Sequence, residues 1–305
     1  MIKYICLLVA ILLCNCSKRT TDTEGVIRVS VLRGPSAIAF AHWMQHPPTL
    51  NGKKFVVKII DTPVQMQANL IKEDVDIAVL PMANAANLHN KGIHYLLAGC
   101  PIWGTLYMVE NKDIEPNDNS LYIFGVGANP DILTRYYLKQ KGLSYSLNYS
   151  FSTAEEVMQA LYIGKAQRAV LSEPFLSMAL QRDSLLHIVA DLNPLEDNIS
   201  GFAQTAILFV PSLEDYRNSL DSLLDISCRF ANEKPKEAIR ILETKKVFPE
   251  KMLTAKCIER CKIKYVPISD SRKNVLRFLQ LLYDYEPKAI GGKLPGKDFT
   301  SSFER

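Results

Sequence analysis

The feature that most constrains the fold of this chain is a helix–turn–strand pattern that occurs twice. Segments 70–81 (LIKEDVDIAVLP) and 161–172 (LYIGKAQRAVLS) share this pattern at a separation of about ninety residues. Loops at Gly34 and Gly127 lie about equally far apart. The repeat predicts an α/β fold made of two lobes of like design. Because any strand–helix–strand unit resembles any other, the alternative is a chance likeness between unrelated units.

Apolar, β-branched runs alternate with helical patterns along the body of the chain. In the first half we expect strands at 26–32, 55–60, 75–80, 95–98 and 105–109, and helices at 37–44, 62–72 and 85–90. In the second half we expect strands at 122–126 and 169–171, and helices at 131–141, 153–164 and from 175 onward. The last third is mostly helical, after a strand at 202–210 that returns the chain to the first lobe. Ser36 is placed to cap the first helix, and Ser152 or Thr153 with Glu155 and Glu156 suits a capping box.

Four loops each follow a predicted strand and precede a predicted helix. In such loops backbone N–H groups lack partners and the helix dipole is positive, which favours an anionic or strongly polar ligand group. Ligands of α/β sheets gather beyond the carboxyl ends of the strands, so two facing lobes would join the four loops in one cleft. The candidate ligand-binding residues in these loops are Arg33, Gly34, Pro35, Ser36, Met82, Ala83, Asn84, Asn129, Pro130, Asp131, Ser172 and Glu173. For each of them the alternative is a structural role as a turn, a helix cap or a solvated charge.

Trp103 and Gly104 form one further candidate pair. An indole ring at this place could stack on a planar ligand. The alternative is a tryptophan buried in the core.

Composition and motifs exclude several classes of function. A hydrophobic content of 48%, a charged content of 22% and a net charge of +4 are those of an ordinary globular protein. No basic run interleaved with aromatic residues occurs, so no nucleic-acid partner is expected. The chain lacks G-x-S-x-G, P-loop, H-E-x-x-H and G-x-G-x-x-G motifs, and its five histidines are scattered. We therefore expect no catalytic residue, no cofactor and no metal site.

Four cysteines follow the N-terminal segment: Cys100, Cys228, Cys257 and Cys261. In an oxidising compartment an even number of cysteines can pair. Cys257 and Cys261 could close a small loop if the chain between them is irregular, but on a regular helix their Cβ atoms lie too far apart. Buried free thiols are the favoured interpretation.

The N-terminus resembles a bacterial lipoprotein signal. Lys3 precedes an apolar run at 5–13, which is too short for a membrane span of about 20 residues. The tetrapeptide at 13–16 (LCNC) resembles a lipobox, although Cys14 and Asn15 stand where small residues are usual. We expect a signal peptide at 1–16, lipid attachment at Cys16, a polar tether at 17–25, and a membrane-anchored place in the cell envelope, facing the periplasm or the exterior. The alternatives are an ordinary cleaved signal and a buried N-terminal strand.

Several segments resemble those of one family of binding proteins. They are VLRGPSAIAFAHWM, DIAVLPMANAANLHNKG, LYMVE, AVLSEPFLSMAL and AIGGKLPGKDF, in the expected order between residue 26 and about residue 299. In these segments the chain is similar to the nitrate/sulfonate/taurine-type and thiamine-precursor-type substrate-binding proteins of ABC importers. Met82 and Ala83 depart from the family, which often has a hydroxyl or amide side chain there, and Gln167-Arg168 replaces an acidic–apolar pair. These departures indicate a ligand less polar than nitrate or a sulfonate.

The resemblance implies a periplasmic-binding-protein type II fold, in which two α/β lobes close on a ligand in a hinged cleft. Crossovers near 109–113 and 200–204 would assign residues 26–110 and 203–305 to lobe 1, and residues 111–202 to lobe 2. The family further implies a small polar or anionic organic ligand, an ABC transporter permease as partner, and action as a monomer without catalysis.

Two other functions are compatible with the sequence. The same fold hosts enzymes of thiamine-pyrimidine and menaquinone-precursor synthesis, but the former carry a cysteine-rich motif that this chain lacks, and both work in the cytoplasm. The other is a sensor or accessory lipoprotein that binds a protein partner. Genes for an importer permease and ATPase next to this gene would argue against the sensor.

Overall fold

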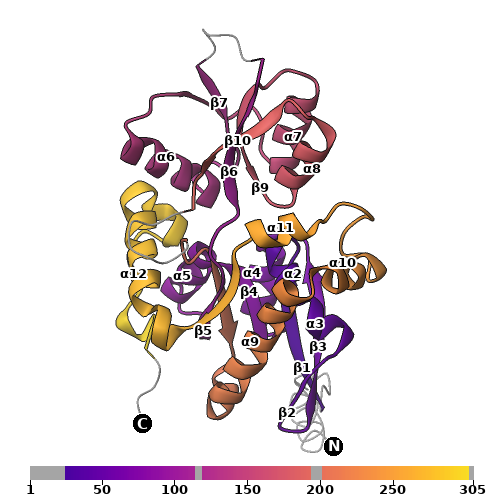
Figure 1. Ribbon diagram of the computed structural model, residues 1–305. Coiled ribbons are helices and arrows are strands. Elements are labelled where there is room, and N and C mark those ends of the chain that lie inside the picture. Colours follow the sequence, from indigo (N-terminus) through magenta and orange to yellow (C-terminus); the bar gives the residue numbers. More distant parts are fainter. Residues whose placement is uncertain (1–24, 114–118, 194–200, 302–305) are drawn as a thin grey trace, which may run out of the picture.

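A computed structural model describes residues 25–113, 119–193 and 201–301 of the 305-residue chain. Figure 1 shows two lobes, each built on its own sheet with helices packed against it. The two-lobed α/β architecture expected from the repeat is therefore confirmed. Cys16 and the tether up to residue 24 lie outside the described residues.

The sheet of lobe 1 is mixed. Its strands are β1 (Val26–Leu32), β2 (Thr49–Leu50), β3 (Lys53–Ile60), β4 (Ile77–Pro81), β5 (Leu96–Ile102), β11 (Thr205–Phe209) and β12 (Ile263–Pro267). They lie in the order β12-β5-β11-β4-β1-β3-β2, with β1 parallel to β3 and β4. Strand β11 runs antiparallel to β4, and Thr205 pairs with Pro81. The start of β11 and the end of β4 therefore lie at the same edge of the sheet.

The sheet of lobe 2 contains β6 (Leu106–Asn111), β7 (Ser120–Tyr122), β8 (Ser146–Asn148), β9 (Arg168–Ser172) and β10 (Leu186–Asp191). The strand order is β10-β6-β9-β7-β8. Strand β6 is antiparallel to both of its neighbours, whereas β7 is parallel to β8 and β9. Strand β9 therefore ends at Ser172 beside the start of β6, where Leu106 pairs with Ser172.

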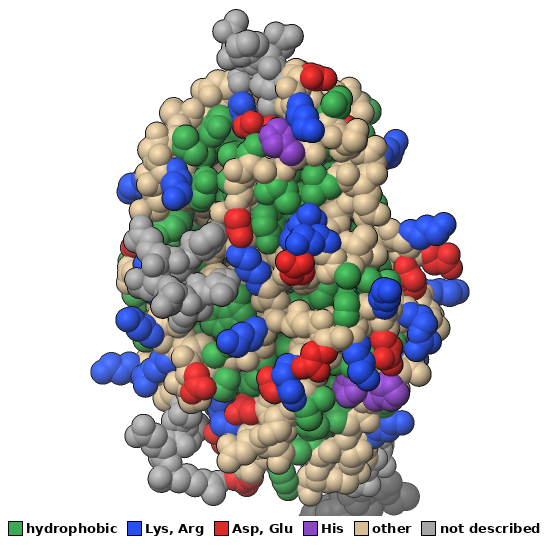
Figure 2. All heavy atoms as spheres, in the orientation of Figure 1, with side chains coloured by type: hydrophobic (Ala, Val, Ile, Leu, Met, Phe, Trp, Pro, Cys, Tyr) green, Lys and Arg blue, Asp and Glu red, His purple; other side chains and the backbone are tan. Residues whose placement is uncertain are grey.

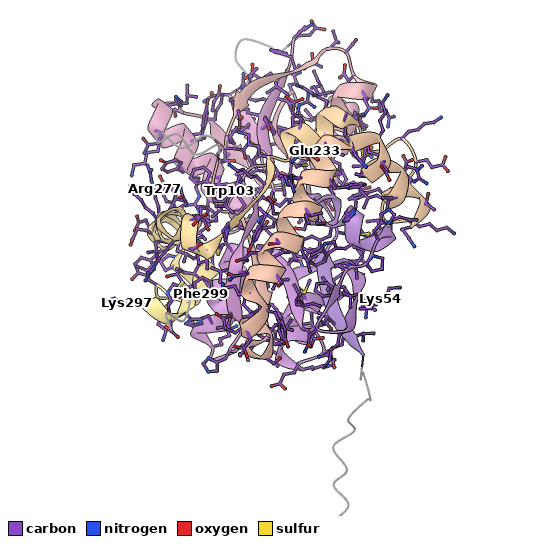
Figure 3. The ribbon with its side chains drawn as sticks, turned by 60° about the horizontal axis from the view of Figure 1, so that its bottom comes forward. Lys54, Trp103, Glu233, Arg277, Lys297 and Phe299 are labelled. Carbon is purple, nitrogen blue, oxygen red and sulfur yellow. The ribbon has the colours of Figure 1, made fainter. Side chains whose placement is uncertain are left out.

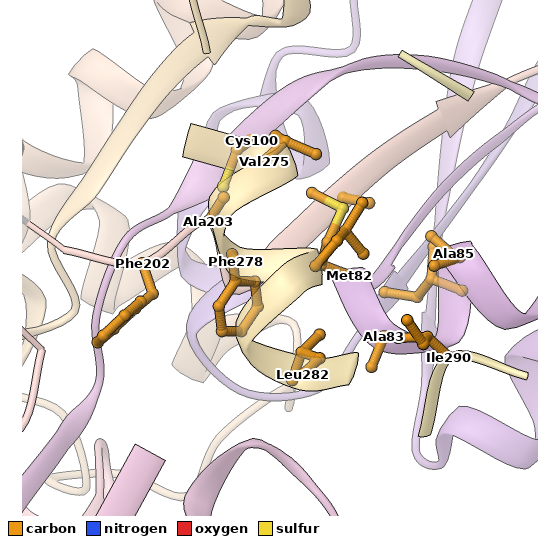
Figure 4. Packing of buried hydrophobic residues seen from close by; sticks show 14 of the residues in the cluster. Met82, Ala83, Ala85, Cys100, Phe202, Ala203, Val275, Phe278, Leu282 and Ile290 are labelled. Atoms are coloured by element: carbon orange, nitrogen blue, oxygen red, sulfur yellow. The ribbon is translucent and has the colours of Figure 1, made fainter. Parts of the chain in front are cut away.

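Helices cover both faces of the first sheet. One face carries α2 (Pro35–Ala39), α3 (Ala41–Gln45), α9 (Arg217–Glu233), α10 (Pro235–Thr244) and α11 (Ala255–Arg260); the other carries α4 (Pro63–Ile71), α5 (Met82–Asn90) and α12 (Ile268–Tyr285). Successive side chains of a strand point to opposite faces of the sheet. In β4, Ile77 and Val79 therefore pack in the core on the first of these faces, and Ala78 and Leu80 pack in a second core on the other face. Figure 4 shows part of this second core, where Met82 of α5 and Phe278 of α12 are buried.

The first helix differs from its prediction. Helix α2 begins at Pro35, with Gly34 at the N-cap and no side-chain hydrogen bond, so the expected cap by Ser36 was wrong. Gly34 has φ 123°, a backbone conformation that L side chains rarely adopt, and Pro35 suits the first helical position because it has no N–H to leave unpaired. The Ser36 hydroxyl is consequently not used by the helix.

Lobe 2 carries three helices in the described part of the chain: α6 (Asn129–Lys141), α7 (Ala154–Tyr162) and α8 (Phe175–Arg182). Helix α7 starts with the expected capping box, in which the Thr153 side chain accepts from the Glu156 N–H and the Glu156 carboxylate accepts from the Thr153 N–H. The apolar side chains of α7 and α8 pack against β6 and β9 in a separate core. Short 3₁₀ helices elsewhere are η1 (Pro211–Tyr216), η2 (Pro287–Ile290) and η3 (Lys297–Phe299).

The chain crosses between the lobes at residues 103–105 and again between β10 and β11. The first crossing lies ahead of the expected 109–113 segment, because β6 pairs within the sheet of lobe 2. The two crossings are in close contact: a Cβ on Gly104 would lie 2.6 Å from Asn193 Cβ, and one on Gly201 would lie 1.8 Å from the Trp103 carbonyl oxygen. Glycine is required at both positions because no side chain fits between the two segments.

The four cysteines are free and buried, as the favoured interpretation states. Cys257 lies in α11 and Cys261 at its C-cap, so helical spacing keeps the pair unbonded. Burial raises the pKa of the Cys100 thiol to about 12.

Basic and acidic side chains are interspersed over the face of the molecule in Figure 2, and no large area of one sign is visible there. Within the described ranges, no helix has the length and apolar character needed to cross a membrane. The same ranges contain no group of three or more His, Cys, Asp or Glu side chains that could hold a metal ion.

Candidate ligand-binding site

A cavity of about 380 Å³ lies between the lobes, where β4 of lobe 1 and β9 of lobe 2 end. We call it the first cavity. Each of the four predicted loops contributes to its wall. The candidate residues that line it are Pro35, Ser36, Ala83, Asn84, Asn129, Pro130 and Ser172.

The wall from lobe 1 presents hydrogen-bond donors. Ser36 is buried against the cavity, and its hydroxyl has no hydrogen-bond partner among the described residues. Helix α5 points its N-terminus at the same space. Its first N–H, from Met82, donates to the Gln204 carbonyl at 2.9 Å, whereas the N–H groups of Ala83 and Asn84 have no partner within the helix by position.

A residue of the wall from lobe 2, Asn129, carries an unsatisfied hydrogen-bond acceptor. Asn129 begins α6, and its Nδ2 donates to the Gln204 carbonyl at 3.4 Å. Its Oδ1 is buried and has no hydrogen-bond partner among the described residues. A buried polar atom left without a partner costs about 1–3 kcal/mol, so a ligand N–H or O–H placed against Asn129 would recover that cost.

Among the described residues, no charged side chain lines the first cavity. Asp131 is in the first turn of α6, but its carboxylate accepts from the Gly127 N–H at 2.8 Å and pairs with Arg135 Nε at 2.9 Å. The Asp131 carboxylate therefore already compensates the positive end of the α6 helix dipole. Most of the remaining wall is apolar, including Phe124 and Leu106. The cavity suits an organic group that is polar and uncharged better than a free anion.

The other candidate residues lie elsewhere. Met82 is fully buried in the second core of lobe 1, and Asp131 serves α6 as described. Trp103 is 3% exposed and its Nε1 donates to the Lys264 carbonyl at 2.8 Å, which makes it a core tryptophan (Figure 3). Gly104 packs against Asn193 at the crossing between the lobes.

Arg33 and Gly34 line a neighbouring cavity instead of the first. Arg33 Nε donates to Asp61 Oδ1 at 2.6 Å, and its Nη1 donates to the Val247 carbonyl. Arg33 is thus neither a free charge nor part of the first cavity.

Glu173 is a buried link between the lobes. Its Oε1 accepts from Ser177 Oγ at 3.0 Å and from Arg260 Nη1 of α11 at 3.4 Å, and its Oε2 accepts from the Ser177 N–H at 3.1 Å. Burial raises the pKa of the Glu173 carboxyl, while the bonds from Ser177 and the charge of Arg260 act in the opposite direction. Because Ser172 is adjacent, this network fixes the end of β9 at the cavity.

The wall also contains residues that the sequence analysis did not select, above all Thr105, Gln204 and Thr205. Gln204 Nε2 donates to Asn193 Oδ1 at 3.3 Å, and Thr105 Oγ1 donates to Gln204 Oε1 at 3.4 Å. These residues do not lie in loops between a strand and a following helix, but β11 is antiparallel to β4 and brings its first residues to the same edge. The polar pair Gln204-Thr205, directly before the apolar run at 206–210, was the signal in the sequence.

No protein-family model matches this chain, and no curated protein sequence matches it. Solved structures do. The E. coli periplasmic aliphatic sulphonate binding protein is 13% identical over 91% of this chain and 92% of its own, with a TM-score of 0.69. The periplasmic nitrate-binding protein of Synechocystis is 11% identical over 91% of this chain and 84% of its own, with a TM-score of 0.61. These likenesses establish the periplasmic-binding-protein type II fold.

A much nearer relative is an ABC transporter protein from Parabacteroides distasonis. It is 53% identical, the match covers 92% of this chain and 100% of that one, and the TM-score is 0.89. The chain therefore belongs to the substrate-binding proteins of ABC transporters, a family of binding proteins rather than enzymes.

Proposed function

We propose that this protein is an envelope lipoprotein that binds a small polar organic molecule in the first cavity and delivers it to the permease of an ABC importer. The observation that carries the proposal is Asn129, which has a buried side-chain Oδ1 without a hydrogen-bond partner and lines the same cavity as Ser36 of the opposite lobe. A ligand bound to both groups joins the two lobes.

The bound end of the ligand is uncharged and carries both a donor and an acceptor. Asn129 Oδ1 accepts a hydrogen bond from the ligand, while the Ser36 hydroxyl and the first turn of α5 donate to a ligand oxygen or nitrogen. In the part of the chain that the structure describes, no lysine or arginine lines this cavity, which disfavours a free nitrate or sulfonate. A primary amide, a urea or a heterocyclic lactam has the required pattern.

The membrane anchor is inferred from sequence alone. Cys16 follows the lipobox-like residues 13–15, and a diacylglycerol there would hold the receptor at the membrane, facing the periplasm or the exterior. Growth with an alkyne-labelled fatty acid tests this step: the wild-type protein should take up the label and Cys16→Ser should not. Equal labelling of the two proteins would refute lipidation at Cys16.

A thermal-shift screen tests the binding function. We expect primary amides, ureas or lactams to stabilise the protein, by about 2.7 kcal/mol at a concentration of 100 Kd. Asn129→Ala should weaken the best compound about three- to tenfold, the contribution of one hydrogen bond, whereas Asn218→Ala on the exposed surface of α9 should not. Stabilisation by nitrate or sulfonates alone, unchanged in Asn129→Ala, would contradict the proposal.

A further inference from the structure

A second cavity, of about 900 Å³, also lies between the lobes. Its wall combines the turn before α2, the segment between α10 and α11, and the first turn of α8. In Figure 1 the helices α8 and α10 face each other across this boundary. The established family membership and the first cavity do not account for this space.

The two cavities share their dividing walls. In lobe 1, Gly34 lines the second cavity and the next residue, Pro35, lines the first. In lobe 2, Ser172 lines the first cavity and Pro174 lines the second. The two cavities therefore border the same two turns.

The second cavity is lined by large apolar side chains. Phe175 and Met178 come from lobe 2, and Phe248 and Met252 come from lobe 1. Phe175, Met178 and Met252 are only partly buried, because they border this open space between the lobes. Methionine side chains adapt to ligands of varied shape, and aromatic rings contribute a large contact area.

The charges around the second cavity oppose an anionic occupant. Arg33 is paired with Asp61. The other charged residues that line the cavity are three acids, Glu155, Glu243 and Glu250, and one base, Lys246. Arg33 also donates to the Val247 carbonyl, so this side chain ties the turn before α2 to the segment that carries Phe248. Arg33 is thereby a positioning residue for the apolar wall.

We propose that the second cavity is the outer compartment of the ligand site and receives the apolar, non-anionic body of the molecule whose uncharged polar end occupies the first cavity. This inference rests on the proposed function. It assigns the transported solute to amphipathic organic molecules with an aromatic ring or a comparable aliphatic body.

Two carboxamides with the same polar end test the proposal by NMR titration: acetamide, and 4-phenylbutyramide, which adds an apolar body. The purified protein should bind 4-phenylbutyramide at least about tenfold more tightly, the gain expected from burying an aromatic ring. Met178→Gln keeps the side-chain length and makes it polar; it should remove most of this gain and leave the affinity for acetamide unchanged. Leu276→Gln, on the outer side of α12 and 45% exposed in the wild type, is the matched control and should change neither affinity.

The outcomes separate this inference from the proposed function. If acetamide binds with dependence on Asn129 but 4-phenylbutyramide binds no more tightly, the outer compartment is refuted and the first cavity stands. A tighter binding that Met178→Gln leaves intact also refutes the compartment, because the ring then lies elsewhere. If neither amide binds, the polar-end chemistry of the proposed function fails and the inference falls with it. A dimer that Met178→Gln dissociates would assign the second cavity to another copy of the chain and overturn the proposal.

Discussion

Arg260→Met tests the buried link between the lobes. Arg260, on α11, is the only positively charged side chain within ion-pair distance of Glu173 among the described residues, and the Glu173 side chain is 0% exposed. Removing one partner of a fully buried ion pair costs roughly 3–5 kcal/mol, because a charge is left buried without compensation. The separation here is 3.4 Å, the Arg260 side chain is 18% exposed, and both bonds from Ser177 persist. We therefore expect a loss of about 2–3 kcal/mol in the free energy of unfolding near pH 8.

The loss of unfolding free energy in Arg260→Met should depend on pH in a defined direction. Burial already raises the pKa of the Glu173 carboxyl, and loss of the Arg260 charge raises it further. In the window between the unfolded-state pKa, about 4.3, and the raised native pKa, the native state binds more protons than the unfolded state. Stability therefore falls as pH rises through this window, and the penalty of Arg260→Met should be smaller at pH 5 than at pH 8.

Urea unfolding followed by the fluorescence of Trp43 and Trp103, both buried, measures the effect at the two pH values. Lys256→Met on the same helix is the matched control, because its pair with Glu259 is 59% and 69% exposed and should contribute about 0.5 kcal/mol or less. If Arg260→Met costs no more than Lys256→Met at either pH, Glu173 and Arg260 do not join the lobes as described.

Two further predictions concern the crossings and the thiols. Gly104→Ala should destabilise the protein by about 1–3 kcal/mol in thermal melts, because the new methyl group overlaps the Asn193 side chain at 2.6 Å; an unchanged melting temperature would show that the crossings are loosely packed. Cys100, Cys228, Cys257 and Cys261 should react with Ellman's reagent only after unfolding, since all four are buried; rapid reaction of the native protein would contradict their burial.

The sequence predicted several residues of the first cavity wall where local rules apply. Strand ends followed by helix starts identified Ser36, Asn84, Asn129 and Ser172, because the carboxyl ends of strands meet at one edge of a sheet and helix N-termini face it. The same rule selected Asp131, whose carboxylate instead satisfies the first turn of its own helix. A sequence pattern shows that a polar group is near a helix start, but not whether it points outward or back to the backbone.

What the sequence could not supply depends on contacts between distant segments. Arg33 turns away from the first cavity because its partners, Asp61 and the Val247 carbonyl, come from elsewhere in lobe 1. Thr205 reaches the cavity only because β11 is inserted antiparallel beside β4. The first crossing lies earlier in the sequence than predicted. An apolar strand at 106–111 could belong to either sheet, and only its pairing with β9 and β10 assigns it to lobe 2.

The most direct test of the central claim is a crystal structure of the protein after exposure to a small-molecule extract of its own cells. The account predicts one bound organic molecule between the lobes, with an uncharged end that donates to Asn129 Oδ1 and accepts from Ser36 Oγ or the first turn of α5. A molecule bound outside the two interlobe cavities, or an inorganic anion held in the first cavity without contact to Asn129, would contradict the account.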